Sequence, residues 1–267
     1  MIKQTFGITQ EPFIRAEHKL LKQQQDIFDI IKIHSQHGGF SVVTGEPGVG
    51  KSVLKRSIES LANDRDTIVV SASRTMHTYL NILKQMAISL KIADISLRDI
   101  EQELIKIAYN YTKDLKTIYT LIDEAHLLDM EVLRKLRLLF DQFPKKHNLI
   151  LFGQRELLFS LSMKVNEDVK SRITFSKNIL PLSDFEIESY VLSELKEVKL
   201  GANVFNEDAL EVIARSVEGN LRLCRNLCYA SMIEACRENK KIINVNHVNA
   251  VLIQPHWRSH EELIKHQ

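Results

Sequence analysis

The sequence predicts an α/β fold in which helices cover both faces of a parallel sheet, followed by a small all-helical domain. Apolar runs of strand length alternate with amphipathic helical stretches up to residue 152, which is the pattern of a parallel sheet. A glycine-rich stretch at residues 45–50 joins the first strand to a helix. From Pro181 onward, helical stretches follow one another with no strand pattern between them.

Strands of the first domain are expected to be buried on both sides, and therefore to read as short, continuous apolar runs. Such runs lie at residues 40–44, 67–70, 118–122 and 149–152.

Helices are expected where apolar residues recur three and four positions apart. In the first domain these stretches are residues 19–35, 51–62, 76–90, 96–111 and 130–143. Ser96 with Asp99 gives the fourth of them a capping-box start, and Pro144 ends the fifth. In the second domain they are residues 183–196, 206–217, 221–239 and 244–253.

The chain is expected to divide into four parts. These are an N-terminal segment with a helix (1–37), the α/β domain (38–178), the helical domain (179–254) and a C-terminal tail (255–267). The tail holds the one tryptophan, Trp257, which either anchors a partner or packs back onto the helical domain.

The composition is that of a soluble globular protein, with 44% hydrophobic and 26% charged residues. A formal net charge of +2 neither requires nor excludes a nucleic-acid partner. The N-terminal residues lack the apolar run of a signal peptide, and no stretch reaches the roughly 18 apolar residues of a membrane helix. We therefore expect a cytoplasmic protein whose cysteines, Cys224, Cys228 and Cys236, are buried free thiols.

The glycine-rich stretch matches the phosphate-binding pattern G-x-x-x-x-G-K-[S/T] in full. Its residues are Gly45, Glu46, Pro47, Gly48, Val49, Gly50, Lys51 and Ser52, with Val53 next as a further nucleotide-binding candidate. Glycines let the backbone curl so that its N–H groups point at phosphate oxygens, and the following helix adds positive charge at its N-terminus. Lys51 is expected on the β- and γ-phosphates of ATP, and the Ser52 hydroxyl on Mg²⁺.

Two acidic residues, Asp123 and Glu124, directly follow the apolar run at 118–122. The carboxyl end of a strand is where α/β sheets bind ligands. We expect Asp123 to bind Mg²⁺ and Glu124 to orient and deprotonate an attacking water. The alternative is an acidic helix N-cap. With Ala125 and His126 the pair also spells the box of one helicase class, but such helicases need two motor domains.

Several weaker motifs occur in a consistent order along the chain. They are Phe6-Gly7, Pro12-Phe13, Asp123-Glu124-Ala125-His126-Leu127-Leu128, Phe152-Gly153-Gln154, Ser171-Arg172-Ile173, Leu180-Pro181-Leu182 and Gly219-Asn220-Leu221-Arg222. Together with the phosphate-binding loop, this series resembles the AAA+ ATPases related to general-secretion-pathway protein A, a group that includes transposon-encoded helper ATPases. The resemblance implies a P-loop AAA+ core followed by a helical lid domain.

The resemblance also implies roles for residues outside the loop. Gln154 corresponds to the sensor 1 residue, which contacts the γ-phosphate or the attacking water. Arg172 resembles an arginine finger that acts on the nucleotide of a neighbouring subunit, with Lys170 and Arg155 as alternatives. A finger supplied by a neighbour implies a ring or a helical filament of this chain.

Two further positions keep alternatives open. Arg222 corresponds to the sensor 2 arginine at the start of a lid helix, and Arg225 is its alternative. Phe13, with Ile14, resembles the segment that packs near adenine, and core packing is the alternative.

The client of the ATPase is far less defined by the sequence. The first hypothesis is a transposition helper that assembles on duplex DNA and recruits or activates a transposase. An assembly factor for a secretion or pilus system and a slowly hydrolysing regulatory switch are the alternatives.

Duplex DNA would be bound by Lys and Arg side chains that reach its phosphates. Lys135 is one position away from Arg134 and so does not share its helix face. For each candidate the alternative is an ordinary solvated helix face. The candidates are Arg74, Arg134, Arg137, Lys145 and Lys146.

Overall fold

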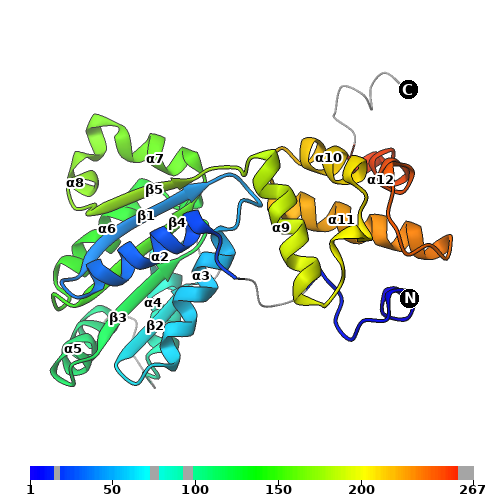
Figure 1. Cartoon of the computed structure of the whole chain (residues 1–267). Coiled ribbons are helices and arrows are strands. Elements are labelled where there is room, and N and C mark those ends of the chain that lie inside the picture. Colours follow the sequence, from blue (N-terminus) through cyan, green and yellow to red (C-terminus); the bar gives the residue numbers. More distant parts are fainter. Residues whose placement is uncertain (15–18, 73–77, 93–98, 258–267) are drawn as a thin grey trace. The chain divides into compact units, whose positions relative to one another are not determined.

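The computed structural model describes residues 1–14, 19–72, 78–92 and 99–257 (Figure 1). These residues form two compact units. One is the α/β unit, Lys19–Ile179, and the other is the helical unit, which combines Met1–His18 with Leu180–Gln267.

A five-stranded parallel sheet forms the centre of the α/β unit, in the order β2-β3-β4-β1-β5. The predicted fold class is confirmed, and the four predicted strands are present, each slightly longer than its apolar run. The strands are β1 (Gly39–Gly45), β2 (Thr67–Ala72), β3 (Thr117–Ile122), β4 (His147–Gly153) and β5 (Phe175–Ile179).

Strand β5 was not predicted from the sequence. It lies at the edge of the sheet and pairs only with β1, from Ser41 opposite Phe175 to Gly45 opposite Ile179. Its middle residues Ser176 and Lys177 are exposed. An edge strand with solvated side chains has no continuous apolar run, so the pattern that identifies the central strands is missing here.

Helices cover both faces of the sheet, as Figure 1 shows. One face carries α2 (Lys22–Ser35) and α3 (Lys51–Glu59), which pack on Ile150 and Phe152 of β4. The opposite face packs through Leu149 and Leu151 of the same strand. Alternate side chains of one strand therefore enter two separate cores. The helices of this second face are α4 (Tyr79–Ser89), α5 (Ile100–Lys113), α6 (Met130–Asp141), α7 (Arg155–Ser162) and α8 (Glu167–Lys170).

Several helix boundaries differ from the sequence prediction, and those of α2, α3 and α5 differ by three or more residues. Helix α5 begins at Ile100 with Asp99 as its N-cap, and Ser96, the predicted capping residue, lies outside the described residues. Helix α3 ends at Glu59 and continues as a 3₁₀ turn, η1 (Ser60–Asn63). Helices α7 and α8 were not predicted because each is short and presents only a few apolar residues.

The helical unit contains α1 (Ile2–Phe6), α9 (Asp184–Glu197), α10 (Glu207–Ser216), α11 (Leu221–Arg237) and α12 (Val245–Leu252). Ser183 caps α9 through a capping box, in which its backbone N–H donates to Glu186 Oε2 at 2.9 Å. The three cysteines lie on the buried face of α11 as free thiols.

The boundaries of the units differ from the predicted division at the N-terminus. Helix α2 packs on the sheet and belongs to the α/β unit, whereas residues 1–18 belong with the C-terminal helices. The reason is that Ile2 and Phe13 are buried in the helical unit. The second boundary falls between Ile179 and Leu180. Among the described residues, no helix combines the length and apolarity that crossing a bilayer requires.

Candidate nucleotide-binding site

The predicted phosphate-binding, acidic and sensor 1 residues of the α/β unit meet at the carboxyl edge of the sheet. Residues 45–52 follow β1, Gln154 follows β4, and Asp123 and Glu124 follow β3. Strand β4 lies between β1 and β3, so these three chain segments are neighbours at one edge. Ligands of open α/β sheets bind outside this edge.

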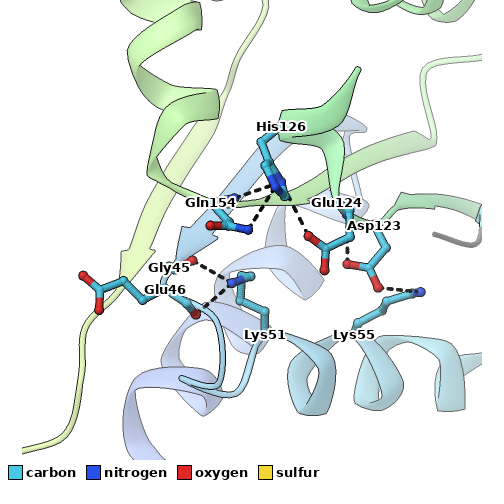
Figure 2. A network of polar contacts seen from close by, with 8 residues as sticks. All are labelled: Gly45, Glu46, Lys51, Lys55, Asp123, Glu124, His126 and Gln154. Atoms are coloured by element: carbon cyan, nitrogen blue, oxygen red, sulfur yellow. Dashed lines mark hydrogen bonds and ion pairs between the residues drawn. The ribbon is translucent and has the colours of Figure 1, made fainter. Parts of the chain in front are cut away.

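The loop at residues 45–52 has the backbone of a phosphate cradle. Gly48 and Gly50 have φ angles of 90° and 105°, which residues with a Cβ rarely adopt. Helix α3 begins at Lys51, so its first N–H groups face the loop. The Lys51 amine donates to the carbonyl oxygens of Gly45 at 2.6 Å and Glu46 at 2.9 Å (Figure 2). The ammonium group is thus held inside the loop.

Both carboxylate oxygens of Asp123 have a partner, one a backbone N–H and the other a lysine amine. Its Oδ1 accepts from the Glu124 backbone N–H at 3.0 Å, and its Oδ2 lies 3.2 Å from the Lys55 amine. Both side chains of this ion pair are largely buried, with 13% of Lys55 and 8% of Asp123 exposed. The Ser52 hydroxyl and the Asp123 carboxylate are the hard oxygen ligands that Mg²⁺ prefers, so these two residues would hold the ion.

Glu124, His126 and Gln154 form a second polar cluster beside Asp123. Glu124 has a φ of 53°, and His126 lies in the following 3₁₀ turn, η2 (Ala125–Leu127). His126 Nδ1 is 3.5 Å from Glu124 Oε2, and its Nε2 is 3.0 Å from Gln154 Nε2. Figure 2 shows the imidazole between the two other side chains.

The comparison with protein families agrees with this geometry. The family model of the AAA domain matches residues 33–161, a range that includes the loop, Asp123, Glu124 and Gln154. The chain carries an AAA domain. This domain is the nucleotide-binding core of the AAA+ ATPases.

Relatives and solved structures extend the similarity beyond the AAA domain. General secretion pathway protein A of Aeromonas hydrophila is 25% identical over 91% of this chain. The chain spans 47% of the length of that protein. The ORC2 protein of Aeropyrum pernix, in ADPNP-ADP complexes, has a TM-score of 0.69 at 17% identity, over 98% of this chain and 74% of its own. Drosophila ORC bound to DNA has the same TM-score at 18% identity, and the match covers 98% of this chain and 67% of the ORC chain.

Arg172 lies at the opposite edge of the sheet from the AAA domain's phosphate loop. It precedes β5, whose first residue pairs with Ser41 near the start of β1. Its side chain is 53% exposed and lies 3.6 Å from Asp141 Oδ2. An arginine in this position is far from the loop of its own domain. Its action on a neighbouring subunit stays a prediction.

The two alternatives to Arg172 have other neighbours. Arg155 lies 3.5 Å from Glu46 Oε1, beside the phosphate loop of its own domain. Lys170 lies 3.7 Å from Glu167 on the same short helix. Arg155 is therefore placed to act within its own subunit.

The predicted residues of the helical unit are described within that unit. Arg222 is exposed on the first turn of α11, and its backbone N–H donates to Asn220 Oδ1 at 3.0 Å. Arg225 donates from Nε to the Phe13 carbonyl oxygen at 2.5 Å. The assignment of Arg222 as the sensor 2 residue, with Arg225 as its alternative, stays a prediction.

In the structure, Phe13 packs in the core of the helical unit, which was the alternative to a place near adenine. It is 1% exposed, and its ring lies edge-on to that of Phe205 at a centroid distance of 6.3 Å. Its neighbour Ile14 is 52% exposed. A place for Phe13 beside adenine stays a prediction.

Four of the five predicted DNA-binding residues lie within the described part of the chain. Arg134 donates to the Val165 carbonyl oxygen at 2.9 Å, and Arg137 lies 3.2 Å from Asp141. These two arginines of α6 are therefore engaged within the domain. Lys145 is exposed and Lys146 half-buried, at the amino edge of the sheet before β4. The fifth candidate, Arg74, lies outside the described residues.

Sequence reasoning missed two residues of the site. Lys55 was detectable from its position one helical turn after Lys51, on the face of α3 that carries the loop's functional groups. His126 was noticed only as part of a helicase-like box and of the motif series, without a role of its own. The sequence signal for His126 was its place two positions after Glu124, together with the polar residue Gln154 directly after the adjacent strand β4.

Proposed function

We propose that the AAA domain binds ATP with Mg²⁺ at residues 45–52 and hydrolyses it. The observation that carries this proposal is the convergence of three strand ends. They deliver a phosphate cradle, two carboxylates and one amide to a single edge of the sheet.

Each of these groups has a defined task. The loop N–H groups and the Lys51 ammonium bind the β- and γ-phosphates. Glu124 orients the attacking water and accepts its proton, and Gln154 donates to the γ-phosphate. Mg²⁺, when bound to Ser52 and Asp123, neutralises charge on the phosphate oxygens. Arg172 contacts the γ-phosphate bound to a neighbouring chain.

The test compares phosphate release by the wild type and by Glu124→Gln. We expect the variant to bind a fluorescent ATP analogue as the wild type does and to lose turnover. Glu167→Gln, at an exposed carboxylate of α8, serves as the control and should turn over normally. Wild-type turnover by Glu124→Gln would refute the role of Glu124.

For the client, we propose duplex DNA and a transposase, in an ATP-dependent ring or filament of this chain. Support comes from the structural similarity to Drosophila ORC bound to DNA and from the basic residues before β4. Duplex DNA should stimulate ATP hydrolysis and give an ATP-dependent gel shift. Reversing charge at Lys145 and Lys146 should weaken the shift, whereas Lys91→Glu, at an exposed lysine after α4, should not.

A second candidate function has its own support. The similarity to general secretion pathway protein A extends over 91% of this chain. It favours an ATPase that remodels a protein partner in a secretion system. Such a protein should hydrolyse ATP at the same rate with and without duplex DNA, so the DNA experiment separates the two candidates.

A further inference from the structure

His126 occupies a position from which it contacts both Glu124 and Gln154. Its ring is 10% exposed. Nδ1 lies 3.5 Å from Glu124 Oε2 and also 3.4 Å from the backbone nitrogen of Gln154. Nε2 lies 3.0 Å from the amide nitrogen of the Gln154 side chain.

The backbone fixes the ring in this place. The left-handed conformation of Glu124 turns the chain directly after Asp123, so that Ala125 is buried and His126 faces the end of β4. Gly153 permits the close approach of β4 to this turn. A Cβ at Gly153 would lie 3.3 Å from the His126 backbone nitrogen and 2.9 Å from Leu157 Cδ2.

A neutral imidazole cannot satisfy all of these neighbours at once. It has one N–H donor and one bare nitrogen acceptor. Nδ1 faces a carboxylate, which only accepts, and a backbone N–H, which only donates. With its proton on Nδ1, the ring donates to Glu124 and Nε2 accepts from the Gln154 amide, but Nδ1 no longer accepts from the Gln154 backbone N–H. With its proton on Nε2, Nδ1 accepts from the Gln154 N–H and the bond to Glu124 is lost.

We propose that His126 is a positioning residue that releases Glu124 when Gln154 engages a γ-phosphate. This inference rests on the proposed ATPase function. A γ-phosphate only accepts hydrogen bonds, so it draws the NH₂ group of Gln154 toward itself. The Gln154 carbonyl oxygen then faces His126 Nε2, which must carry the proton. The proton leaves Nδ1 for water and another is taken up at Nε2, so the charge of the ring is unchanged. Glu124 loses its partner and turns to the attacking water.

The most direct test is the ¹⁵N spectrum of the histidine rings, which distinguishes a protonated ring nitrogen from a bare one. His126→Gln assigns the His126 signals by their disappearance. We expect the proton on Nδ1 in the nucleotide-free and ADP-bound protein. With a non-hydrolysable ATP analogue we expect it on Nε2. The same tautomer in all three states would overturn the inference.

Kinetics gives the second test. His126→Phe keeps the ring shape but removes both nitrogens, so Gln154 loses the Nε2 partner that turns its NH₂ group toward the γ-phosphate. This loss should lower kcat about tenfold with an unchanged KM, even though Glu124 is no longer held. In a Gln154→Ala background the same change should have little further effect, because the two residues act as one unit. Leu127→Ala, at an exposed side chain of the same turn, should leave kcat unchanged. Additive losses in the double variant would contradict the coupling.

The outcomes separate this inference from the proposed function. If the wild type releases no phosphate, the ATPase proposal itself is wrong. If the wild type hydrolyses ATP and His126→Phe does so equally fast, only the role of His126 is wrong. If His126→Phe does not fold, the spectrum of the wild-type protein decides alone.

Discussion

At the scale of single residues, the carboxylate of Asp123 has two competing cations. Lys55 forms a largely buried ion pair with it at 3.2 Å. The same carboxylate is the proposed ligand of Mg²⁺. A buried carboxylate that loses its partner is costly because the protein interior solvates charge poorly. The ion pair therefore stabilises the edge of the sheet before nucleotide arrives.

This competition gives a stability prediction. Lys55→Met removes the ammonium group and keeps the side-chain length, and should lower the free energy of unfolding by about 1–3 kcal/mol without Mg²⁺. Mg²⁺ with ATP should restore part of the loss. The control is Lys106→Met, which breaks the exposed pair with Glu103 and should have little effect. Denaturant unfolding with and without MgATP measures both, and equal losses in the two variants would contradict the role of Lys55.

At the scale of elements, His147 joins the end of α6 to the start of β4. Its ring stacks on Phe140 at a centroid distance of 4.4 Å and lies 2.9 Å from the Thr120 hydroxyl. Burial lowers the pKa of His147 from 6.5 to about 3. The folded protein therefore keeps this ring neutral at pH values where the unfolded chain protonates it.

A dependence of stability on pH follows from this difference. As the pH falls below about 6.5, the unfolded state binds a proton that the folded state does not, so the free energy of unfolding decreases. At pH 5 the loss relative to pH 7 should be about 2 kcal/mol. His147→Phe keeps an aromatic ring and should remove this part of the slope, whereas His256→Gln, at an exposed histidine, should not. Unfolding curves between pH 5 and 7 measure the change of the free energy of unfolding with pH. An unchanged slope in His147→Phe would contradict the role of His147 in this pH dependence.

Elements also show how far the sequence predicts this molecule. The buried strands β1 to β4 and the long amphipathic helices were found because burial imposes a clear apolar pattern. The loop was found from its motif, Asp123 and Glu124 from their place at the end of a predicted strand, and Gln154 from the family resemblance. Strand β5 was missed because solvent, not a core, surrounds its edge. Lys55 was missed although it lies one helical turn after Lys51. His126 was missed because polar contacts between chain segments that follow different strands leave no periodic pattern in the sequence.

At the scale of the whole molecule, the proposed role of Arg172 as an arginine finger requires a neighbouring subunit. It lies at the amino edge of the sheet, whereas the phosphate loop lies at the carboxyl edge. A single subunit therefore does not bring the two together within its α/β unit. A heterologous contact, repeated around a ring or along a filament, would supply the arginine of one subunit to the loop of the next.

Mixing experiments test this arrangement. Arg172→Ala and Glu124→Gln should each lack turnover alone, because the first lacks the finger and the second the base. Their mixture should recover activity at sites that combine Glu124 of one subunit with Arg172 of another. Arg172→Ala mixed with the double variant Arg172→Ala/Glu124→Gln offers no finger and should stay inactive. Wild-type turnover by Arg172→Ala alone would remove the assignment.

The central claim is that residues 45–52 bind ATP with Mg²⁺, and isothermal titration calorimetry tests it most directly. The wild-type protein should bind MgATP at a single site per chain. Lys51→Ala removes the ammonium group that the loop holds at 2.6 Å from Gly45, and should weaken binding at least about tenfold. Lys113→Ala, at an exposed lysine at the end of α5, should bind as the wild type does. The absence of any heat of binding to folded wild-type protein would contradict the account.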